Sequence, residues 1–166
     1  VLISFQSLSD NWHLAWEDSR KADGLILLGY GDYENYRPRL QRLVEQGSKF
    51  VRWGSPEEGD VGHTIGSDNR LGGRLAGEAL LGKGRRRIAF LGDASDHYPE
   101  FHDRYLGLTE VAGDLVVAQE DALTLERHGY DAAARLFARV PDVDAVFAGS
   151  DLIAIGAMRV LARHGL

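Results

Sequence analysis

Short apolar runs alternate with helical patterns along this chain. Three of the runs are nearly unbroken, namely Gly24–Leu28, Arg87–Leu91 and Asp144–Ala148. Unbroken apolar runs are expected where a parallel strand is covered on both faces. The other predicted strands are Val1–Phe5, Lys49–Trp53 and Asp114–Ala118.

Between the strands, apolar residues recur at the spacing of a helical face. A last helix is predicted from Ser150-Asp151, as N-cap, to His164-Gly165. This regular alternation of strands and helices predicts an α/β fold with doubly wound parallel sheet. The residues predicted to share a face are Leu8, Trp12, Ala15 and Trp16; Leu40, Leu43 and Val44; Leu71, Leu75, Ala79 and Leu80; Tyr130, Ala133, Ala134 and Phe137; and Ala154, Ala157, Met158 and Leu161.

The stretch Gly77–Gly84, GEALLGKG, comes within one residue of the phosphate-loop pattern G-x-x-x-x-G-K-[ST]. A phosphate loop needs its glycines between a strand and the helix that follows, whereas here the helix comes first. We therefore interpret Gly82–Gly84 as the C-terminal turn of a helix. Gly29-Tyr30-Gly31 begins like G-x-G-x-x-G, but Glu34 replaces the third glycine.

Composition excludes several classes of function. The chain has 166 residues, 44% of them hydrophobic, which is enough for one substantial core or two small ones. It has no cysteine, so thiolate catalysis and cysteine-bound zinc are excluded, and a net charge of −6 argues against a DNA-binding surface on these residues. No hydrolase or metalloprotease motif is present, so we predict no catalytic residue, metal or cofactor. The ligand-type residues between Asp93 and Asp103 are interpreted as a solvated loop rather than a metal site.

Three segments, in the right order, resemble the LacI/GalR family of bacterial transcription repressors. The first, Ala22–Leu27, is similar to the family's V-D-G-I-I-L. The second runs from Asp68-Asn69 through Gly72-Gly73, Ala76 and Gly84–Gly92 to Arg104 and Gly107, and is similar to D-N-x-x-G-G-x-x-A, G-H-R-R-I-A and R-x-x-G. The third, Asp144–Ala157, is similar to D-A-V-F-x-x-N-D-x-x-A-x-G-A.

The resemblance implies a periplasmic-binding-protein type I fold, in which two α/β lobes hold an effector between them. Residues 1–66 would belong to the N-terminal lobe and 67–166 to the C-terminal lobe, with a crossover near Ile65–Ser67. We expect the chain to be a piece of a longer protein, incomplete at both ends and lacking the helix-turn-helix domain. A cytoplasmic homodimer that binds operator DNA through that domain is implied.

The effector is expected beyond the carboxyl ends of the strands. Arg104 matches the family arginine that reaches the effector, although a surface ion pair would also explain it. Ser150 replaces the family's sugar-contacting Asn and could be a plain N-cap, and Trp53, at a position where the family often has Asp, offers a stacking face or a core side chain. The remaining candidate effector-binding residues are Tyr30, Tyr98, Glu100 and Asp151.

These substitutions leave the identity of the effector open, with a sugar or a related metabolite expected. A second reading is a periplasmic sugar-binding protein of a transporter, which shares the fold and similar segments. The basic form of Gly84–Ala89 favours the repressor. An enzyme on a flavodoxin-like sheet is a third reading.

Overall fold

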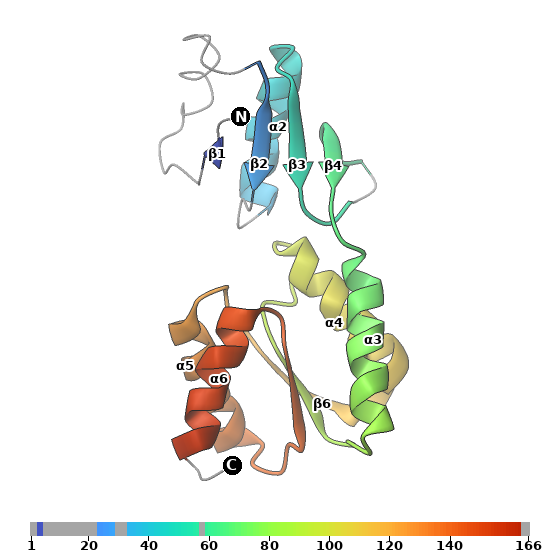
Figure 1. Ribbon diagram of the computed structural model, residues 1–166, viewed down its shortest axis with the longest axis vertical. Helices are drawn as coiled ribbons and strands as arrows, with labels where there is room; N and C mark the ends of the chain where they lie inside the picture. The colour runs from blue at the N-terminus through green and yellow to red at the C-terminus, as the bar shows by residue number, and fades with distance from the viewer. Residues whose placement is uncertain (1–2, 5–22, 29–32, 57–58, 164–166) are drawn as a thin grey trace. The chain divides into compact units, whose positions relative to one another are not determined.

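The computed structural model describes residues 3–4, 23–28, 33–56 and 59–163. The chain divides into two compact units, one made of residues 1–67 with 97–99 and the other of 68–96 with 100–166. Each unit is built on its own parallel sheet flanked by helix (Figure 1). None of the helices that the structure describes is long and apolar enough to cross a membrane.

The first unit contains a four-stranded parallel sheet and one described helix. The strands lie in the order β1 (Ile3–Ser4), β2 (Leu25–Leu28), β3 (Phe50–Trp53) and β4 (His63–Ile65), and α2 covers Tyr33–Glu45. The core is formed by Leu25 and Leu27 of β2 with Leu40 and Leu43 of α2, since alternate residues of β2 point toward the helix. Val44, which we had placed on the same helical face, is half exposed. The predicted helix around Trp12 and Trp16 lies outside the described residues.

Strand β4 was not predicted, because its three residues, HTI, are too few to give a periodic pattern. The fully buried Arg52 of β3 holds this part of the sheet together. Its Nε donates to the Thr64 hydroxyl of β4 at 3.0 Å, and its Nη2 pairs with the Asp60 carboxylate at 2.5 Å. The two contacts tie the connection between β3 and β4 to the strands that it joins.

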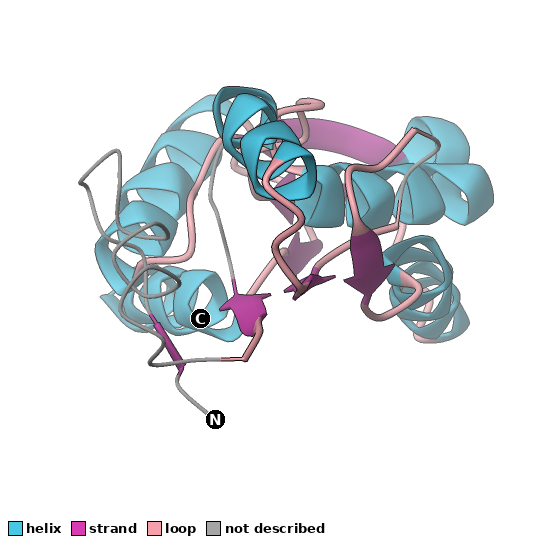
Figure 2. Cartoon of the chain, turned by 90° about the horizontal axis from the view of Figure 1, so that it is seen from above, coloured by secondary structure: helices cyan, strands magenta, loops and turns pink. Residues whose placement is uncertain are grey.

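The second unit is a three-layer α/β arrangement. Its parallel sheet has the order β6 (Val116–Glu120), β5 (Ile88–Leu91) and β7 (Ala145–Ala148). Helices α3 (Asn69–Gly82) and α4 (Pro99–Ala112) lie on one side, and α5 (Glu126–Arg139) and α6 (Asp151–Arg163) on the other (Figures 1 and 2). All four residues of the central strand β5 are fully buried, as an unbroken apolar run predicts.

One strand of this sheet is displaced from its predicted position. We expected Asp114–Ala118, whereas Gly113–Leu115 form a 3-10 turn and β6 begins at Val116. The strand continues through the polar pair Gln119 and Glu120, whose side chains are held by hydrogen bonds rather than by apolar packing. A pattern based on hydrophobicity therefore ends the strand too early.

The helices of the second unit pack through glycine faces, which corrects our assignment of their buried sides. A Cβ atom on Gly73 of α3 would lie 2.1 Å from the Arg104 carbonyl oxygen of α4, and one on Gly156 of α6 would lie 2.1 Å from the Glu126 carbonyl oxygen of α5. Glycine permits backbones to approach this closely. Leu71 and Leu75, predicted to be buried, are 42% and 56% exposed on the other side of α3. The helical period was correct, but the buried face was wrong.

The glycine-rich stretch ends α3 and lies before β5, so it does not have the strand–loop–helix order of a phosphate loop. Gly84 has a φ of 79°, and the Arg85 amide donates to the Leu80 carbonyl at 3.1 Å. This left-handed turn closes the helix and confirms the predicted C-terminal turn. The Arg86 guanidinium donates to the Leu81 carbonyl at 3.3 Å, so this cation complements the C-terminal end of the helix.

Candidate binding site

A pocket opens at the carboxyl end of β7, where the second unit brings three helices together. Its volume of about 620 Å³ falls in the range of small-molecule sites. This is the edge of a parallel sheet at which ligands of α/β proteins bind. The lining residues are Gly72, Arg104, Val146, Phe147, Ala148, Gly149, Ser150, Asp151 and Ala154.

Arg104 projects from α4 into this pocket and is held from two sides. Its Nε donates to the Oδ1 of Asn69, the first residue of α3, at 2.9 Å. Its Nη1 donates to the carbonyl oxygen of Gly149, directly after β7. The guanidinium also lies 5.9 Å from the centre of the Phe101 ring. These contacts fix the side chain relative to both α3 and β7. A solvated surface arginine would lack such contacts.

The charge of Arg104 is maintained despite its partial burial. Burial lowers the pKa of its guanidinium, while the carboxylates of Glu100 and Asp151 act in the opposite direction. Because an arginine pKa normally exceeds 12, the side chain remains protonated at neutral pH. The pocket therefore presents one permanent positive charge with two carboxylates nearby.

Ser150 and Asp151 begin α6 at the rim of the pocket. The Ser150 hydroxyl accepts a hydrogen bond from the Ile153 amide at 3.5 Å, and the Ser150 carbonyl accepts one from the Ala154 amide at 3.0 Å. Ser150 thus caps the helix and lines the pocket at the same time. The Gly149 amide donates to the Leu91 carbonyl at 2.7 Å, which anchors the end of β7 to β5.

The structure brings together three of the predicted site residues, Arg104, Ser150 and Asp151. Glu100 lies one turn before Arg104 in the first turn of α4. Trp53, at the end of β3, is 53% exposed and belongs to the first unit, as does Tyr98. Tyr30 lies outside the described residues. The role of all these residues in effector binding stays a prediction.

Sequence reasoning overlooked Asn69, which is only 6% exposed. Asp68-Asn69 was noted as part of the family pattern but received no role. Asp68 is the N-cap of α3, since its Oδ1 accepts the Leu71 amide at 2.7 Å. The contact from Asn69 to Arg104 joins residues 35 positions apart. Spacing along the chain therefore gave no signal for it.

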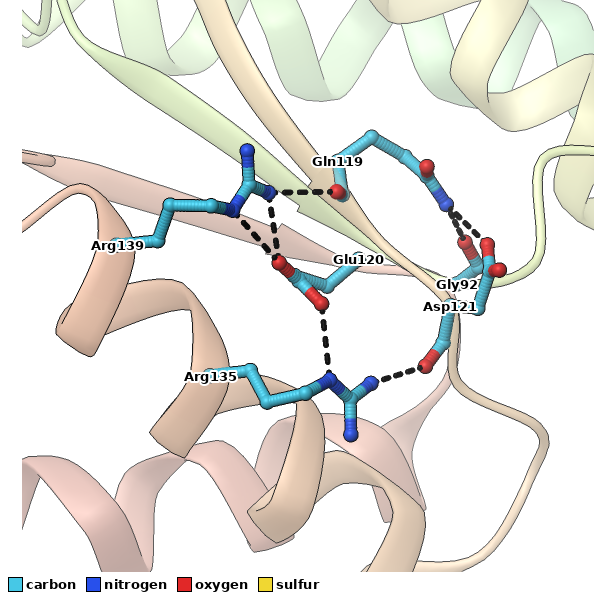
Figure 3. A network of polar contacts seen from close by, with 6 residues as sticks. All are labelled: Gly92, Gln119, Glu120, Asp121, Arg135 and Arg139. Atoms are coloured by element: carbon cyan, nitrogen blue, oxygen red, sulfur yellow. Dashed lines mark hydrogen bonds and ion pairs between the residues drawn. The ribbon is translucent and has the colours of Figure 1, made fainter.

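A polar network closes the same edge of the sheet beside β6 (Figure 3). Gln119 donates to the Gly92 carbonyl and to the Asp121 carboxylate, both at 2.7 Å. The Glu120 carboxylate accepts from Arg135 at 3.0 Å and from Arg139 at 2.6 Å. The network fixes the loop after β6 to the loop after β5, and both loops lie at the carboxyl edge.

No metal-binding cluster of three or more His, Asp or Glu side chains occurs among the described residues. The predicted loop after β5 is shorter than expected, because α4 begins at Pro99 and includes His102. The Nδ1 of His102 is 2.7 Å from the Ala94 carbonyl oxygen, and its Nε2 is 3.5 Å from Asp96. The Asp93 carboxylate accepts the Ser95 amide at 3.0 Å. The contacts of His102 join the start of α4 to this loop, and that of Asp93 lies within the loop.

Comparisons with known proteins agree on the fold. Residues 78–166 match the family model of the periplasmic binding protein-like domain. The HTH-type transcriptional regulator CelR of Thermobifida fusca is 37% identical over 153 residues, which cover 86% of this chain and 43% of CelR. A solved structure of a transcriptional regulator CelR–cellobiose complex superimposes with a TM-score of 0.75 at 31% identity, covering 91% of this chain and 47% of that one. The α/β class and the periplasmic-binding-protein-like fold are thereby confirmed.

A transport protein is also similar to this chain. The ribose import binding protein RbsB of Salmonella typhimurium is 32% identical over 112 residues, covering 65% of this chain and 38% of RbsB. The chain spans less than half the length of these curated relatives. These relatives are a transcriptional regulator and an import binding protein rather than enzymes.

Proposed function

The chain belongs to the LacI family of transcriptional regulators and forms part of its effector-binding domain, and from this premise we propose that it senses a sugar-like effector and controls operator binding. The DNA would be read by a helix-turn-helix domain outside these residues. We further propose that the protein works in the cytoplasm as a homodimer.

The observation that carries this proposal is the fixed orientation of the Arg104 guanidinium in the pocket of the second unit. Asn69 and Gly149 accept two of its hydrogen bonds, so the side chain is oriented before any ligand arrives. A preorganised donor lowers the entropic cost of binding. Ser150 and Asp151 supply hydroxyl and carboxylate acceptors on the same lining. Donors and acceptors together suit the hydroxyl groups of a sugar.

The relatives support a sugar as the effector class. The CelR structure was solved with cellobiose, and RbsB is named for ribose import. An effector that binds one conformation of the regulator more tightly shifts its population toward that conformation. By reciprocity the affinity for DNA then changes, with a coupling free energy of roughly 1–3 kcal/mol. No chemical step is involved.

The test is calorimetric titration of the full-length protein with cellobiose, D-ribose and D-glucose, followed by operator binding with and without the sugar that binds. We expect at least one sugar to bind and to change the DNA affinity about 5- to 150-fold. Arg104→Ala should weaken the sugar about tenfold or more, because a charge-assisted donor is lost. Arg127→Ala is the matched control, since this side chain is 88% exposed in α5.

The second candidate function, favoured by the similarity to RbsB, is sugar binding for transport. It predicts sugar binding without any effect on DNA. A folded protein that binds sugar and never binds DNA would support the transporter and contradict the regulator. A folded protein that binds no sugar at all would contradict both.

A further inference from the structure

We propose that Asn69 is a specificity-determining positioning residue, which restrains Arg104 so that the pocket accepts neutral hydroxyl-bearing effectors and discriminates against phosphorylated or carboxylate ones. This inference rests on the proposed function and adds the charge class of the effector.

The hydrogen bonds of Arg104 limit how it can grip an anion. A guanidinium binds a carboxylate or phosphate most strongly through two parallel N–H groups, either Nε with Nη2 or Nη1 with Nη2. Nε is engaged by Asn69 and Nη1 by the Gly149 carbonyl. Each edge of the fork therefore has one nitrogen already engaged. Nε has a single N–H, which Asn69 takes, so the edge formed by Nε and Nη2 cannot grip an anion through both nitrogens. The donors left for a ligand are the second N–H of Nη1 and the two of Nη2, none of which bonds a residue that the structure describes.

The helices that begin at this edge of the sheet do not offer a substitute anion site. A helix N-terminus attracts anions through its unpaired amides and its dipole. The first turns of α4, α5 and α6 already contain Glu100, Glu126 and Asp151, respectively. The positive end of each helix dipole is thus offset by a carboxylate of the protein itself. Glu126 is in addition paired with Arg159.

The charges around the pocket favour a neutral ligand for the same reason. Among the lining residues that the structure describes, Arg104 is the single Lys or Arg and Asp151 is the acidic residue. The carboxylates of Glu100 and Asp151 both act on Arg104. A phosphate group has only acceptor atoms at neutral pH and would face these carboxylates with like charge. A sugar hydroxyl can accept from Nη2 and donate its own proton to Ser150 or Asp151.

Matched pairs of sugars test the charge preference directly. The full-length protein is titrated with D-ribose and D-ribose 5-phosphate, D-glucose and D-glucose 6-phosphate, and cellobiose and its 6-phosphate. We expect the neutral member of each bound pair to bind about tenfold or more tightly, since like charges placed together are penalised in binding. Tighter binding of a phosphorylated member would overturn this inference and leave the proposed function standing. Binding of neither member of any pair would overturn the proposed function and this inference together.

Variants at position 69 test the positioning role. Asn69→Leu removes the acceptor and releases Nε, so the ratio of neutral to phosphorylated affinity should fall about tenfold. Asn69→Asp keeps an acceptor oxygen for Nε and should retain the preference for neutral ligands. The control is Arg70→Ala on the same helix, whose side chain pairs with Glu110 rather than with Arg104 and should leave the ratio unchanged.

The readout is the ratio of affinities, because a loss of packing alone would weaken both members of a pair equally. Equal weakening by Asn69→Leu would therefore show that Asn69 has only a structural role and would contradict the proposal. If Asn69→Leu does not fold, the comparison of Asn69→Asp with the unaltered protein decides. A reversal of preference in Asn69→Asp would then count against the proposal.

Discussion

The two edge strands of the second unit's sheet, β6 and β7, are bordered by side chains of opposite character, charged at β6 and apolar at β7. At β6, Arg135 and Arg139 of α5 reach over the strand to Glu120 (Figure 3). The Glu120 carbonyl accepts the Gly92 amide on the β5 side, so the Gln119 carbonyl points outward, where Arg139 donates to it at 3.2 Å. Charged side chains thus occupy the outward hydrogen-bonding groups of this edge.

The β7 edge has an apolar surface instead. A groove of about 690 Å³ runs between this strand and α6. Apart from Arg85 and Asp144, its lining is apolar, and Met158 is 65% exposed. The whole predicted stripe of α6, from Ala154 through Ala157 and Met158 to Leu161, lies on this groove.

The difference shows how one sheet can protect one edge from pairing with a further strand and leave the other edge open to such pairing. Charged side chains on an edge strand oppose the addition of a further strand, whereas an apolar edge favours it. The charged side chains that cover the β6 edge, Arg135 and Arg139, come from α5, whereas α6 borders the groove at β7. Any change that separates these two helices should therefore disturb both edges together.

The largest effect is expected from Gly156→Val in α6. A Cβ at this position would lie 2.1 Å from the Glu126 carbonyl oxygen and 2.5 Å from the Tyr130 amide nitrogen, and neither backbone atom can yield without moving α5. The loss in unfolding free energy should be about 3 kcal/mol or more. Urea unfolding of the full-length protein measures it. Gly82→Ala in α3 is the control, because a Cβ there meets no atom within 4 Å and should cost nothing.

The glycine faces also mark the limit of what the sequence could predict. The apolar runs of β2, β5 and β7 were correctly placed. Burial on both faces explains the unbroken run of β5, whereas β2 alternates between buried and exposed residues. Helices α2, α3 and α5 were predicted, but no helical face was predicted for α4. The buried side of α3 was assigned wrongly, because Gly73 does not register as hydrophobic. The stripe assigned to α6 was correct at Ala157, but it included the exposed Met158 and missed Gly156 for the same reason. Close backbone packing replaces side-chain packing on these faces, and periodicity in leucine and alanine then reports the exposed side.

The site was predictable in part for a similar reason. Ser150 and Asp151 stand after a strand at the start of a helix, a position at which parallel sheets bind ligands, whereas Arg104 lies in the second turn of α4 and was predicted from the family pattern. The partners of Arg104 were not predictable, since Asn69 and the Gly149 carbonyl come from distant parts of the chain and one of them is backbone. Orientation of a side chain depends on such tertiary contacts.

The next largest effect should come from removing the ion pairs of Glu120 with Arg135 and Arg139 at the β6 edge. Glu120 is 13% exposed, while Arg135 and Arg139 are more than half exposed, so solvent screens much of the attraction. Glu120→Ala should lower the unfolding free energy by about 1 kcal/mol. Glu120→Gln keeps the shape of the side chain and loses its charge. Its unfolding free energy should therefore lie between those of the unaltered protein and Glu120→Ala. A loss of less than a few tenths of a kcal/mol would mean that the network does not stabilise this edge.

The same carboxylate predicts a dependence on pH. Burial raises the pKa of Glu120, but hydrogen bonds and charges from Arg139 and Arg135 outweigh this and leave the pKa below its usual value. A lowered pKa in the folded state stabilises the protein above the unfolded value of about 4.3. The stabilisation is lost as the pH falls through the folded pKa. The gap in unfolding free energy between the unaltered protein and Glu120→Gln should therefore be constant from pH 7 to 5 and close below about pH 4. A gap that widens toward acid would contradict the assignment.

The smallest effect on stability is expected at the β7 edge, from Met158→Lys. Because this side chain is 65% exposed, the unfolding free energy should change by no more than about 0.5 kcal/mol. The added charge should nevertheless reduce self-association through the groove, since a lysine beside an edge strand opposes strand addition. Sedimentation of the full-length protein at increasing concentration measures this, with Met158→Leu as the apolar control. If Met158→Lys lowers the unfolding free energy by several kcal/mol, the groove must be covered by other residues of the full-length protein. Both edges would then be covered, β6 by charged side chains and β7 by apolar ones.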